Sequence, residues 1–352
     1  MNYIGSKKSL LSFLDESINA VVGKTAESFC DIFAGTGAVG TYFKRKGYQI
    51  IANDIQYYAY VLNRHYVGNH KLLPFNGLAD ELSLSNMAVE NRSAAVCVFL
   101  ERLKGTSGFI YKNYALGGSV GTEFERMYFS DENAERCDAI RTKIEEWKNS
   151  GKITEDEYFF LLATLLESID KTANTASVYG AFLKKLKNSA KTALTMQPVE
   201  LILNDKEHFI YNQDANQLIR KIKSDILYMD PPYNERQYCA NYHLLETIAK
   251  YDNPVIFGKT GLRNYKEQKS RYCSKSSVKE AFKDIVENAR VKYIFLSYNN
   301  EGLLGLDDIK EVFSQKGEYG CFEREYNRFK ADANRQYQAS KTTEYLHYCI
   351  CK

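Results

Sequence analysis

The chain has 352 residues, and its 47 Lys and Arg side chains against 44 Asp and Glu give a formal net charge of only +3. At about 150 residues per domain the length suggests two domains, and 44% apolar with 13% aromatic residues excludes a disordered chain. No apolar run approaches the roughly 20 residues that span a bilayer, and residues 1–14 lack the apolar segment of a secretory signal. We expect a soluble protein that does not coat nucleic acid non-specifically but can still grip it along one face.

The eight cysteines contain no Cys-x-x-Cys pair, and no histidine lies at zinc-finger spacing from them. Free cysteine packs as a small hydrophobic residue, so we expect reduced thiols and neither zinc nor disulfides. These cysteines are Cys30, Cys97, Cys137, Cys239, Cys273, Cys321, Cys349 and Cys351.

The first predicted strand covers residues 28–33 and leads into the turn Ala34-Gly35-Thr36-Gly37-Ala38-Val39-Gly40. A helix is expected to follow and to end at Lys46-Gly47. A second strand is predicted at 48–52, just before Asn53-Asp54. This strand–helix–strand order is typical of a parallel sheet with helices on its faces.

From about residue 78 to 205 the pattern changes to helices, with few strand signals. Ser130 can cap one helix, and Thr154-x-x-Glu157 is a capping box that opens the next, over 155–172. Strand patterns return afterwards, and connections inside a compact unit rarely exceed about a dozen residues. We therefore predict one α/β domain interrupted by a helical insertion: core at 1–77, insertion at 78–205, and core again at 206–352. The later strands are predicted at 209–212, 225–229, 291–297, 321–329 and 343–351.

The glycine-rich turn is the first candidate binding element. Without a Cβ, Gly35 and Gly37 let backbone amides approach a ligand closely, although a tight strand-to-helix turn explains them equally well. Asp54, at the end of the next strand, favours a ligand because an acid there can accept both ribose hydroxyls of a nucleoside. The full dinucleotide-binding fingerprint is not present.

The second candidate element is Asp230-Pro231-Pro232-Tyr233, directly after the apolar run 226–229. Prolines cannot donate to a sheet, so they turn the chain out at its carboxyl edge, where α/β proteins bind ligands. The carboxylate of Asp230 and the carbonyl of Pro231 could accept the two N–H bonds of an exocyclic amino group, making its nitrogen nucleophilic. Tyr233 can stack on a base. The alternative is a strand-end turn with an incidental acid.

These elements occur in order with Tyr3-Ile4-Gly5-Ser6-Lys7 near the start and Asp214 ahead of the second element. In that order the chain resembles the alpha-group N6-adenine-specific DNA methyltransferases, which include Dam-type enzymes and many restriction–modification methylases. Residues 230–238 and 241–246 look like a subgroup that accompanies type II restriction endonucleases. The resemblance covers most of the chain, including residues 108–114 and 173–180 of the predicted insertion.

The resemblance implies a Rossmann-like S-adenosylmethionine-dependent methyltransferase core with an inserted, mainly helical target-recognition domain. It implies that residues 230–233 hold the target adenine and that no metal takes part. Taken alone, Lys7 would be a solvated lysine, and a helix N-cap would explain Asp214 equally well. The implied cofactor contacts are Tyr3, Gly5 and Lys7 at the methionine end, Lys7 near its carboxylate; Asp31, Phe33, Gly35 and Gly37 around the methionine moiety, Asp31 towards its amino group; Asp54 at the ribose; and Asp214 with Ala215 at the cofactor adenine.

Weaker candidates lie elsewhere. His243 and Asn241 follow the second element, but a neutral histidine in the first turn of a helix is the simpler interpretation. Residues 259–292 hold ten Lys and Arg against four Asp and Glu, which could follow DNA phosphates or only form a solvated loop. Further basic residues lie at 184–191, and others surround an expected hairpin that the family uses near a flipped base. The hairpin residues are Arg328, Lys330, Arg335 and Lys341.

We therefore predict an enzyme that transfers the methyl group of S-adenosylmethionine to N6 of a flipped adenine in duplex DNA, as the modification arm of a restriction–modification system. Two alternatives stay open: an RNA base N-methyltransferase, and a catalytically silent DNA-binding specificity subunit. We expect a monomeric cytoplasmic protein, bacterial or phage-encoded, whose partners are duplex DNA and a separately acting restriction endonuclease.

Overall fold

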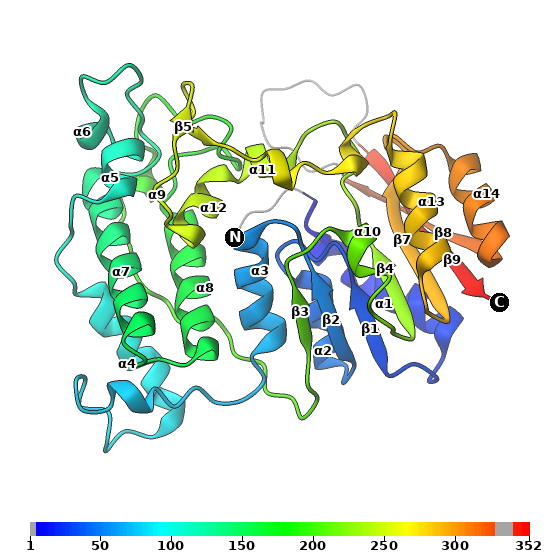
Figure 1. Cartoon of the computed structure of the whole chain (residues 1–352), viewed down its shortest axis with the longest axis horizontal. Helices are drawn as coiled ribbons and strands as arrows, with labels where there is room; N and C mark the ends of the chain where they lie inside the picture. Colours follow the sequence, from blue (N-terminus) through cyan, green and yellow to red (C-terminus); the bar gives the residue numbers. More distant parts are fainter. Residues whose placement is uncertain (1–4, 328–340) are drawn as a thin grey trace. The chain divides into compact units, whose positions relative to one another are not determined.

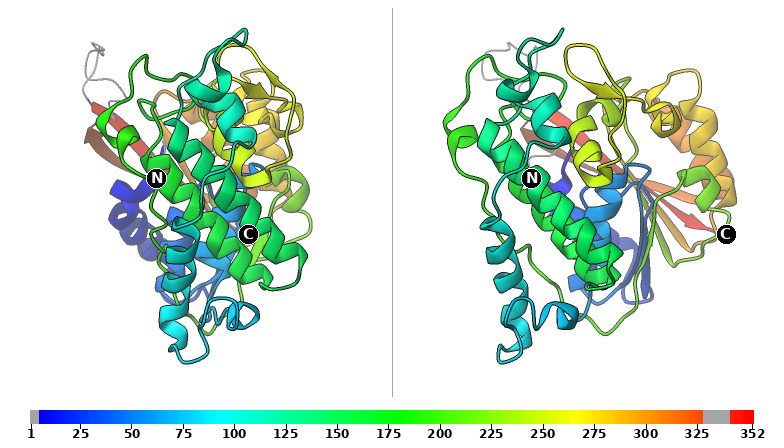
Figure 2. Two further views of the ribbon diagram at one scale, coloured as in Figure 1. Left: turned by 90° about the vertical axis from the view of Figure 1, so that its left-hand side faces the viewer. Right: turned by 60° about the vertical axis from the view of Figure 1, so that its left-hand side comes forward.

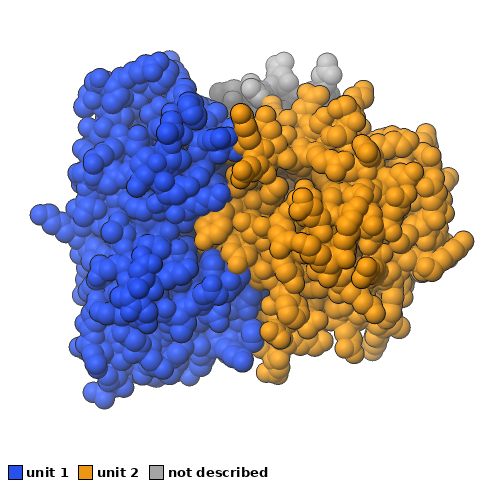
Figure 3. All heavy atoms as spheres, viewed as in Figure 1, with its two compact units in different colours: residues 1–3, 64–203, 240–265 blue, residues 4–63, 204–239, 266–352 orange. Residues whose placement is uncertain are grey.

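A computed structural model describes residues 5–327 and 341–352, which form two compact units (Figure 3). The helical unit contains residues 64–203 and 240–265, and the sheet unit contains the described parts of 5–63, 204–239 and 266–352. The helical unit begins before the predicted insertion boundary at residue 78 and takes a second segment from beyond it. No helix of the described residues is long and apolar enough to cross a membrane.

The sheet unit is built on a seven-stranded sheet with the order β3-β2-β1-β4-β7-β9-β8 (Figure 1). The strands from β3 to β7 run parallel, whereas β9 pairs antiparallel with both β7 and β8. The order reverses between β1 and β4, the position where doubly wound sheets bind ligands. The strands are β1 (Ser28–Asp31), β2 (Gln49–Asn53), β3 (Phe209–Tyr211), β4 (Ile226–Met229), β7 (Tyr293–Asn299), β8 (Gly317–Asn327) and β9 (Lys341–Cys351).

The strand sequences explain why this sheet is central. All four residues of β4, Ile-Leu-Tyr-Met, are buried, as expected for a parallel strand covered on both faces. Each predicted strand of the core corresponds to an observed one, and the ends differ by a few residues. The α/β fold class is confirmed.

Helices pack on both faces of the sheet. On one face Phe29 of β1 stacks on Phe43 of α2 at 4.2 Å between ring centroids. On the other face, apolar residues of β1, β4 and β7 form one buried cluster with α10, α13 and α14. The helices of the sheet unit are α1 (Leu11–Val22), α2 (Ala38–Arg45), α3 (Tyr57–Asn63), α10 (Ala215–Leu218), α13 (Val278–Asn288) and α14 (Leu306–Lys316), with short 3₁₀ turns η1 (Lys7–Leu10), η4 (Lys266–Gln268) and η5 (Arg271–Cys273). A further helix, α11 (Tyr238–Asn241), starts in the sheet unit and ends in the helical unit.

The helical unit is centred on two long helices, α7 (Asp131–Asn149) and α8 (Glu155–Lys171), which lie side by side (Figure 2). Both predicted caps are present: Ser130 accepts from the amide of Asn133, and Thr154 and Glu157 form the reciprocal capping box. The remaining elements are η2 (Arg64–Gly68), η3 (Asn76–Leu78), α4 (Val89–Glu101), α5 (Phe109–Tyr114), α6 (Leu116–Ser119), α9 (Asn188–Lys191), α12 (His243–Lys250) and the hairpin strands β5 (Ile256–Phe257) and β6 (Leu262–Arg263).

Residues 240–265 join the helical unit through buried hydrogen bonds. The guanidinium of Arg141 on α7 donates to the carbonyls of Ile248 and Ala249 at the end of α12. The side chain of Arg141 is only 3% exposed, so these bonds satisfy a buried cation. The carbonyl groups that end α12 are therefore capped by a helix far away in sequence.

Candidate active site

The two candidate elements meet on neighbouring strands of the sheet unit. Strand β1 ends at Asp31, which pairs in register with Tyr228 of β4, and Asp230 follows two residues later. Both acids therefore lie at the carboxyl edge of the sheet, beside the reversal of strand order. The sequence placed these residues almost 200 positions apart, and the parallel pairing brings them together.

The glycine-rich turn is fixed by one side chain that directly follows β2 and one from α3. The amide of Gly35 donates to Asp54 Oδ2 at 2.8 Å, and Asn63 Nδ2 donates to the carbonyl of Gly35 at 2.9 Å. Gly37 has a φ of +80°, and a Cβ there would lie 2.8 Å from Asn63 Oδ1. The turn therefore requires glycine at 37, both for its left-handed backbone and for space.

Asp54 has a role in the protein that the sequence did not reveal. Besides the Gly35 amide, its carboxylate accepts from the amide of Gln56 at 2.8 Å. Asp54 thus joins the glycine-rich turn to the end of β2. Its predicted contact with ribose hydroxyls stays a prediction.

Asp31 is the most unusual acid of this edge. It is 1% exposed, and its Oδ1 has no hydrogen-bond partner among the described residues. Burial raises the pKa of Asp31 well above its ordinary value, with nearby Asp230 and Asp54 adding to the effect. A cationic amino group would satisfy the orphan oxygen and remove this electrostatic cost. The site therefore fits the amino end of a methionine moiety.

Asp230 is partly accessible and ion-paired. Its side chain is 19% exposed, and Oδ1 lies 3.1 Å from Nζ of Lys7. Burial raises the pKa of Asp230 to about 6, although Lys7 opposes the rise and Glu344 adds to it. Asp230 is thus an ionised acceptor near neutral pH and a protonated acid below about pH 6.

Lys7 also contacts Glu344 of β9, which sequence reasoning missed. Lys7 Nζ lies 2.8 Å from Glu344 Oε1, and the side chains are only 7% and 1% exposed. Ser297 on β7 donates to the same carboxylate oxygen. A signal was present: Glu344 shares a strand face with Leu346, which is fully buried. A charged residue in phase with a core position indicates a buried partner.

The remaining predicted cofactor residues are placed as follows. Asp214 caps the short helix α10, its side chain accepting from the Gln217 amide at 3.0 Å, while Ala215 begins that helix. Phe33 packs edge-on against Tyr272. A Cβ on Gly5, whose φ is +79°, would lie 3.1 Å from the hydroxyl of Tyr238. Tyr3 lies outside the described residues.

The weaker candidates do not add to this edge. His243 is fully buried in the helical unit, where its ring nitrogens lie 3.0 Å from the carbonyl oxygens of Ala240 and Thr260. Burial lowers the pKa of His243, which fits the structural interpretation. Of the predicted basic hairpin, Arg328, Lys330 and Arg335 fall outside the described residues, as does the side chain of Lys341.

The basic stretch 259–292 is partly neutralised by ion pairs. Lys279 Nζ lies 2.7 Å from Asp308 Oδ1 and 3.0 Å from Glu311 Oε2. Lys292 pairs with Asp225 at 2.9 Å, and Arg263, Arg271 and Lys283 also have acidic partners. The sequence count of +6 therefore overstates the positive charge that this stretch offers to DNA.

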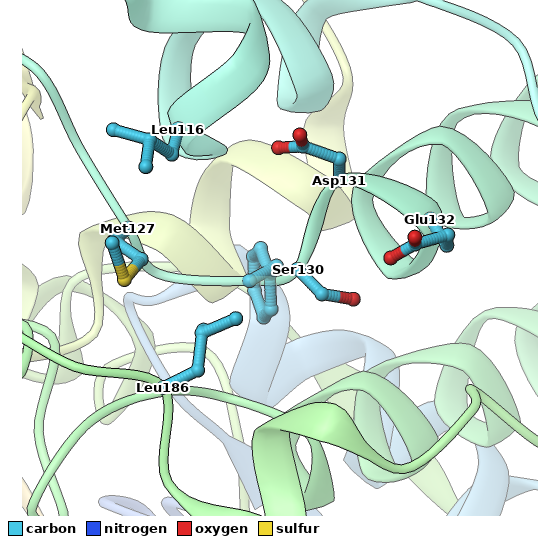
Figure 4. Close-up of a pocket in the computed structure, with 7 residues that line it drawn as sticks. Leu116, Met127, Ser130, Asp131, Glu132 and Leu186 are labelled. Atoms are coloured by element: carbon cyan, nitrogen blue, oxygen red, sulfur yellow. The ribbon is translucent and has the colours of Figure 1, made fainter.

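The helical unit has a separate hollow of about 240 Å³ at the start of α7 (Figure 4). Leu116, Met127 and Leu186 supply apolar wall, and Asp131 and Glu132 supply two carboxylates. These acids disfavour phosphate, and none of the predicted site residues lines the hollow. The candidate acids Asp31 and Asp230 therefore lie at the carboxyl edge of the sheet and not at this hollow.

Comparison with known proteins finds one matching family and several similar proteins. The model of the D12 class N6 adenine-specific DNA methyltransferase family matches residues 3–342. The Type II methyltransferase M.NlaIII of Neisseria lactamica is 50% identical, over 99% of this chain and 98% of that protein. The Type II methyltransferase M.CviAII of Paramecium bursaria Chlorella virus 1 is 34% identical, over 94% and 93%. M.FokI of Planomicrobium okeanokoites is 39% identical over 99% of this chain, which spans about half (52%) of that protein.

Proposed function

Because the chain belongs to the D12 class of N6-adenine-specific DNA methyltransferases, we propose that it methylates adenine at one specific duplex sequence, with S-adenosylmethionine as methyl donor. We further propose that it is the modification enzyme of a restriction–modification system, because similar proteins are named Type II methyltransferases and modification methylases. It would act as a monomer in the compartment that holds the DNA, separately from a cognate endonuclease. The alternatives of an RNA methyltransferase and a silent specificity subunit are not favoured by the family.

The single observation that supports this proposal is that Asp31 and Asp230 lie at the same edge of the sheet, at the ends of neighbouring strands. Asp31 offers an orphan buried oxygen that suits the amino group of the cofactor. Asp230, on the neighbouring strand, offers a carboxylate that is ionised at neutral pH because its pKa is about 6. When bound, S-adenosylmethionine supplies an electrophilic methyl group.

The residues of this chain would then prepare the target. The base must leave the stack, because the N6 amino group is not accessible inside a duplex. The Asp230 carboxylate and the Pro231 carbonyl would accept its two N–H bonds, which localises the nitrogen lone pair for attack. Tyr233, half-buried beside the core cluster, would stack on the base. Gly35, Gly37 and Asp54 would keep the cofactor pocket in shape.

The helical unit is our proposal for sequence recognition. Its helices α7 and α8 form an independent core, and nothing in the methyl-transfer chemistry assigned above requires them. The boundaries we propose for it are those of the compact unit, 64–203 and 240–265.

The function is tested by expressing the chain in a host that lacks adenine methylation. We expect N6-methyladenine in host DNA at one short sequence, and plasmid from that host should resist those restriction enzymes that methylation of that sequence blocks. Purified protein should transfer tritiated methyl groups to duplex DNA and not to ribosomal RNA. Label in the RNA alone, or DNA binding without transfer, would instead favour one of the alternatives.

DNA affinity is expected to fall with salt, because phosphate contacts release counterions. Replacing exposed Lys275 by Gln should reduce the slope of log Kd against log salt by about one if that side chain contacts a phosphate. The matched change Lys279→Gln should leave the slope nearly unchanged, since Asp308 and Glu311 already neutralise Lys279. Fluorescence anisotropy with a labelled duplex measures both. A flat salt response in the wild-type protein would reject a basic DNA-binding surface.

A further inference from the structure

A buried cation at the carboxyl edge is shared between two acids. Lys7 Nζ lies 3.1 Å from Asp230 Oδ1 and 2.8 Å from Glu344 Oε1. The shorter contact is to Glu344, which the methyl-transfer chemistry does not use. One ammonium therefore serves two carboxylates, and the group as a whole carries one excess negative charge.

Glu344 is held in place more firmly than a surface acid could be. It lies on β9, where it pairs in register with Asn299 of β7, and Ser297 of β7 donates to the same oxygen that contacts Lys7. Its side chain is 1% exposed. A carboxylate so buried requires a permanent partner, and Lys7 provides one.

Because Lys7 is shared with Glu344, Asp230 can stay ionised and still accept hydrogen bonds from a ligand. An ammonium paired with Asp230 alone would occupy the lone pairs that the adenine amino group needs. Without any ammonium, burial would favour the protonated acid, which is a poor acceptor. A cation anchored elsewhere, and only partly engaged with Asp230, avoids both outcomes.

We propose that Glu344 is a positioning residue for methyl transfer: it anchors Lys7 so that the ammonium keeps Asp230 ionised and oriented while leaving it free to accept from the target amino group. The inference rests on the proposed role of Asp230. It assigns Lys7 a position between two acids, in addition to the cofactor contact that the resemblance implies.

The charged and titratable groups around Asp230 come from several elements. Lys7 of η1 lowers the pKa of Asp230, and Glu344 of β9 raises it. Asp31 of β1 and Tyr228 of β4 also interact electrostatically with Asp230, and Asp31 interacts in turn with Asp54. Since transfer requires ionised Asp230, the rate should fall as the pH drops through about 6.

The test is a pH profile of the single-turnover rate on duplex DNA at saturating S-adenosylmethionine, from about pH 5 to about pH 8. In Glu344→Gln, one negative charge is lost and Lys7 pairs with Asp230 alone. We expect the acidic limb of the pH–rate profile to move to lower pH, because Glu344 no longer raises the pKa of Asp230. The plateau rate should drop about tenfold, because the ammonium then occupies the carboxylate that the target amino group needs. Lys7→Met should move the limb to higher pH, and the double variant should return it towards the wild-type position, because the two residues act as one unit.

The matched control is Glu323→Gln, the same charge change at an exposed position of β8, which should leave both limb and plateau unchanged. If Glu344→Gln fails to fold, Glu344→Asp replaces it, with a smaller shift in the same direction. A loss of thermal stability with an unshifted limb and plateau would overturn the proposal. A fully active Asp230→Asn enzyme would instead overturn the proposed role of Asp230, which separates the two failures.

Discussion

Replacing Asp230 by alanine is expected to lower the methyl-transfer rate by about a hundred- to a thousandfold, since deleting one preorganised group at a reacting centre costs about 10²–10³. The Pro231 carbonyl alone cannot hold both N–H bonds. The affinity for S-adenosylmethionine should change little, because Asp230 belongs to the loop after β4 and not to the glycine-rich turn. Radiolabelled transfer and calorimetric cofactor binding measure the two quantities.

The variant also removes one partner of Lys7, which still has Glu344, so the fold should survive. Asp307→Ala removes an exposed acid in the first turn of α14 of the same unit and should retain full activity. Retention of wild-type activity in Asp230→Ala would show that the activating acceptor lies elsewhere.

Replacing Asp31 by asparagine is expected to weaken S-adenosylmethionine binding by about 10- to 100-fold, since a hydrogen bond to a charged group contributes about 1.5–3 kcal/mol. In the wild-type protein burial raises the pKa of Asp31 well above its ordinary value, so the free protein retains this proton to unusually high pH. A bound ammonium favours the carboxylate and lowers that pKa. At any pH between the pKa of Asp31 in the free protein and its lower pKa in the complex, cofactor binding should therefore release a proton.

Calorimetry in buffers of different ionisation enthalpy detects this release directly. The release should disappear in Asp31→Asn, whose side chain cannot titrate. As a comparison, Asp307→Asn should bind the cofactor as the wild type does and release the same number of protons. Binding of equal strength in Asp31→Asn would place the amino group of the cofactor elsewhere.

Local patterns predicted the parts of the fold that depend on local physics. The glycine-rich turn at residues 34–40 indicates a tight connection from a strand to a helix. Gly37 does take a left-handed backbone there. Ser130 and Thr154 were recognisable as caps because capping satisfies neighbouring amides. The loop 230–233 was recognisable because two consecutive prolines cannot donate to a sheet, so the chain must leave the strand there.

Long-range contacts were beyond such patterns. Lys7 and Glu344 are 337 residues apart, and only the antiparallel addition of β9 to β7 brings them together. Residues 240–265 belong to the helical unit because Arg141 is buried against α12, which no periodicity reveals. The ion pairs of 259–292 were hidden for the same reason: Asp225, Asp308 and Glu311 lie outside the stretch that was counted.

The register between β1 and β4 has an evolutionary consequence. Asp31 pairs in register with Tyr228, two residues before Asp230, so backbone pairing of two adjacent strands of the sheet unit sets the spacing of the two acids. If these acids hold the methyl donor and the target base as proposed, that spacing comes from the sheet unit. On that proposal, mutations in the helical unit, or the exchange of a whole segment of it, would leave the register of β1 and β4 unchanged. If the helical unit reads the DNA sequence as proposed, new specificities can arise from a sheet unit that stays the same.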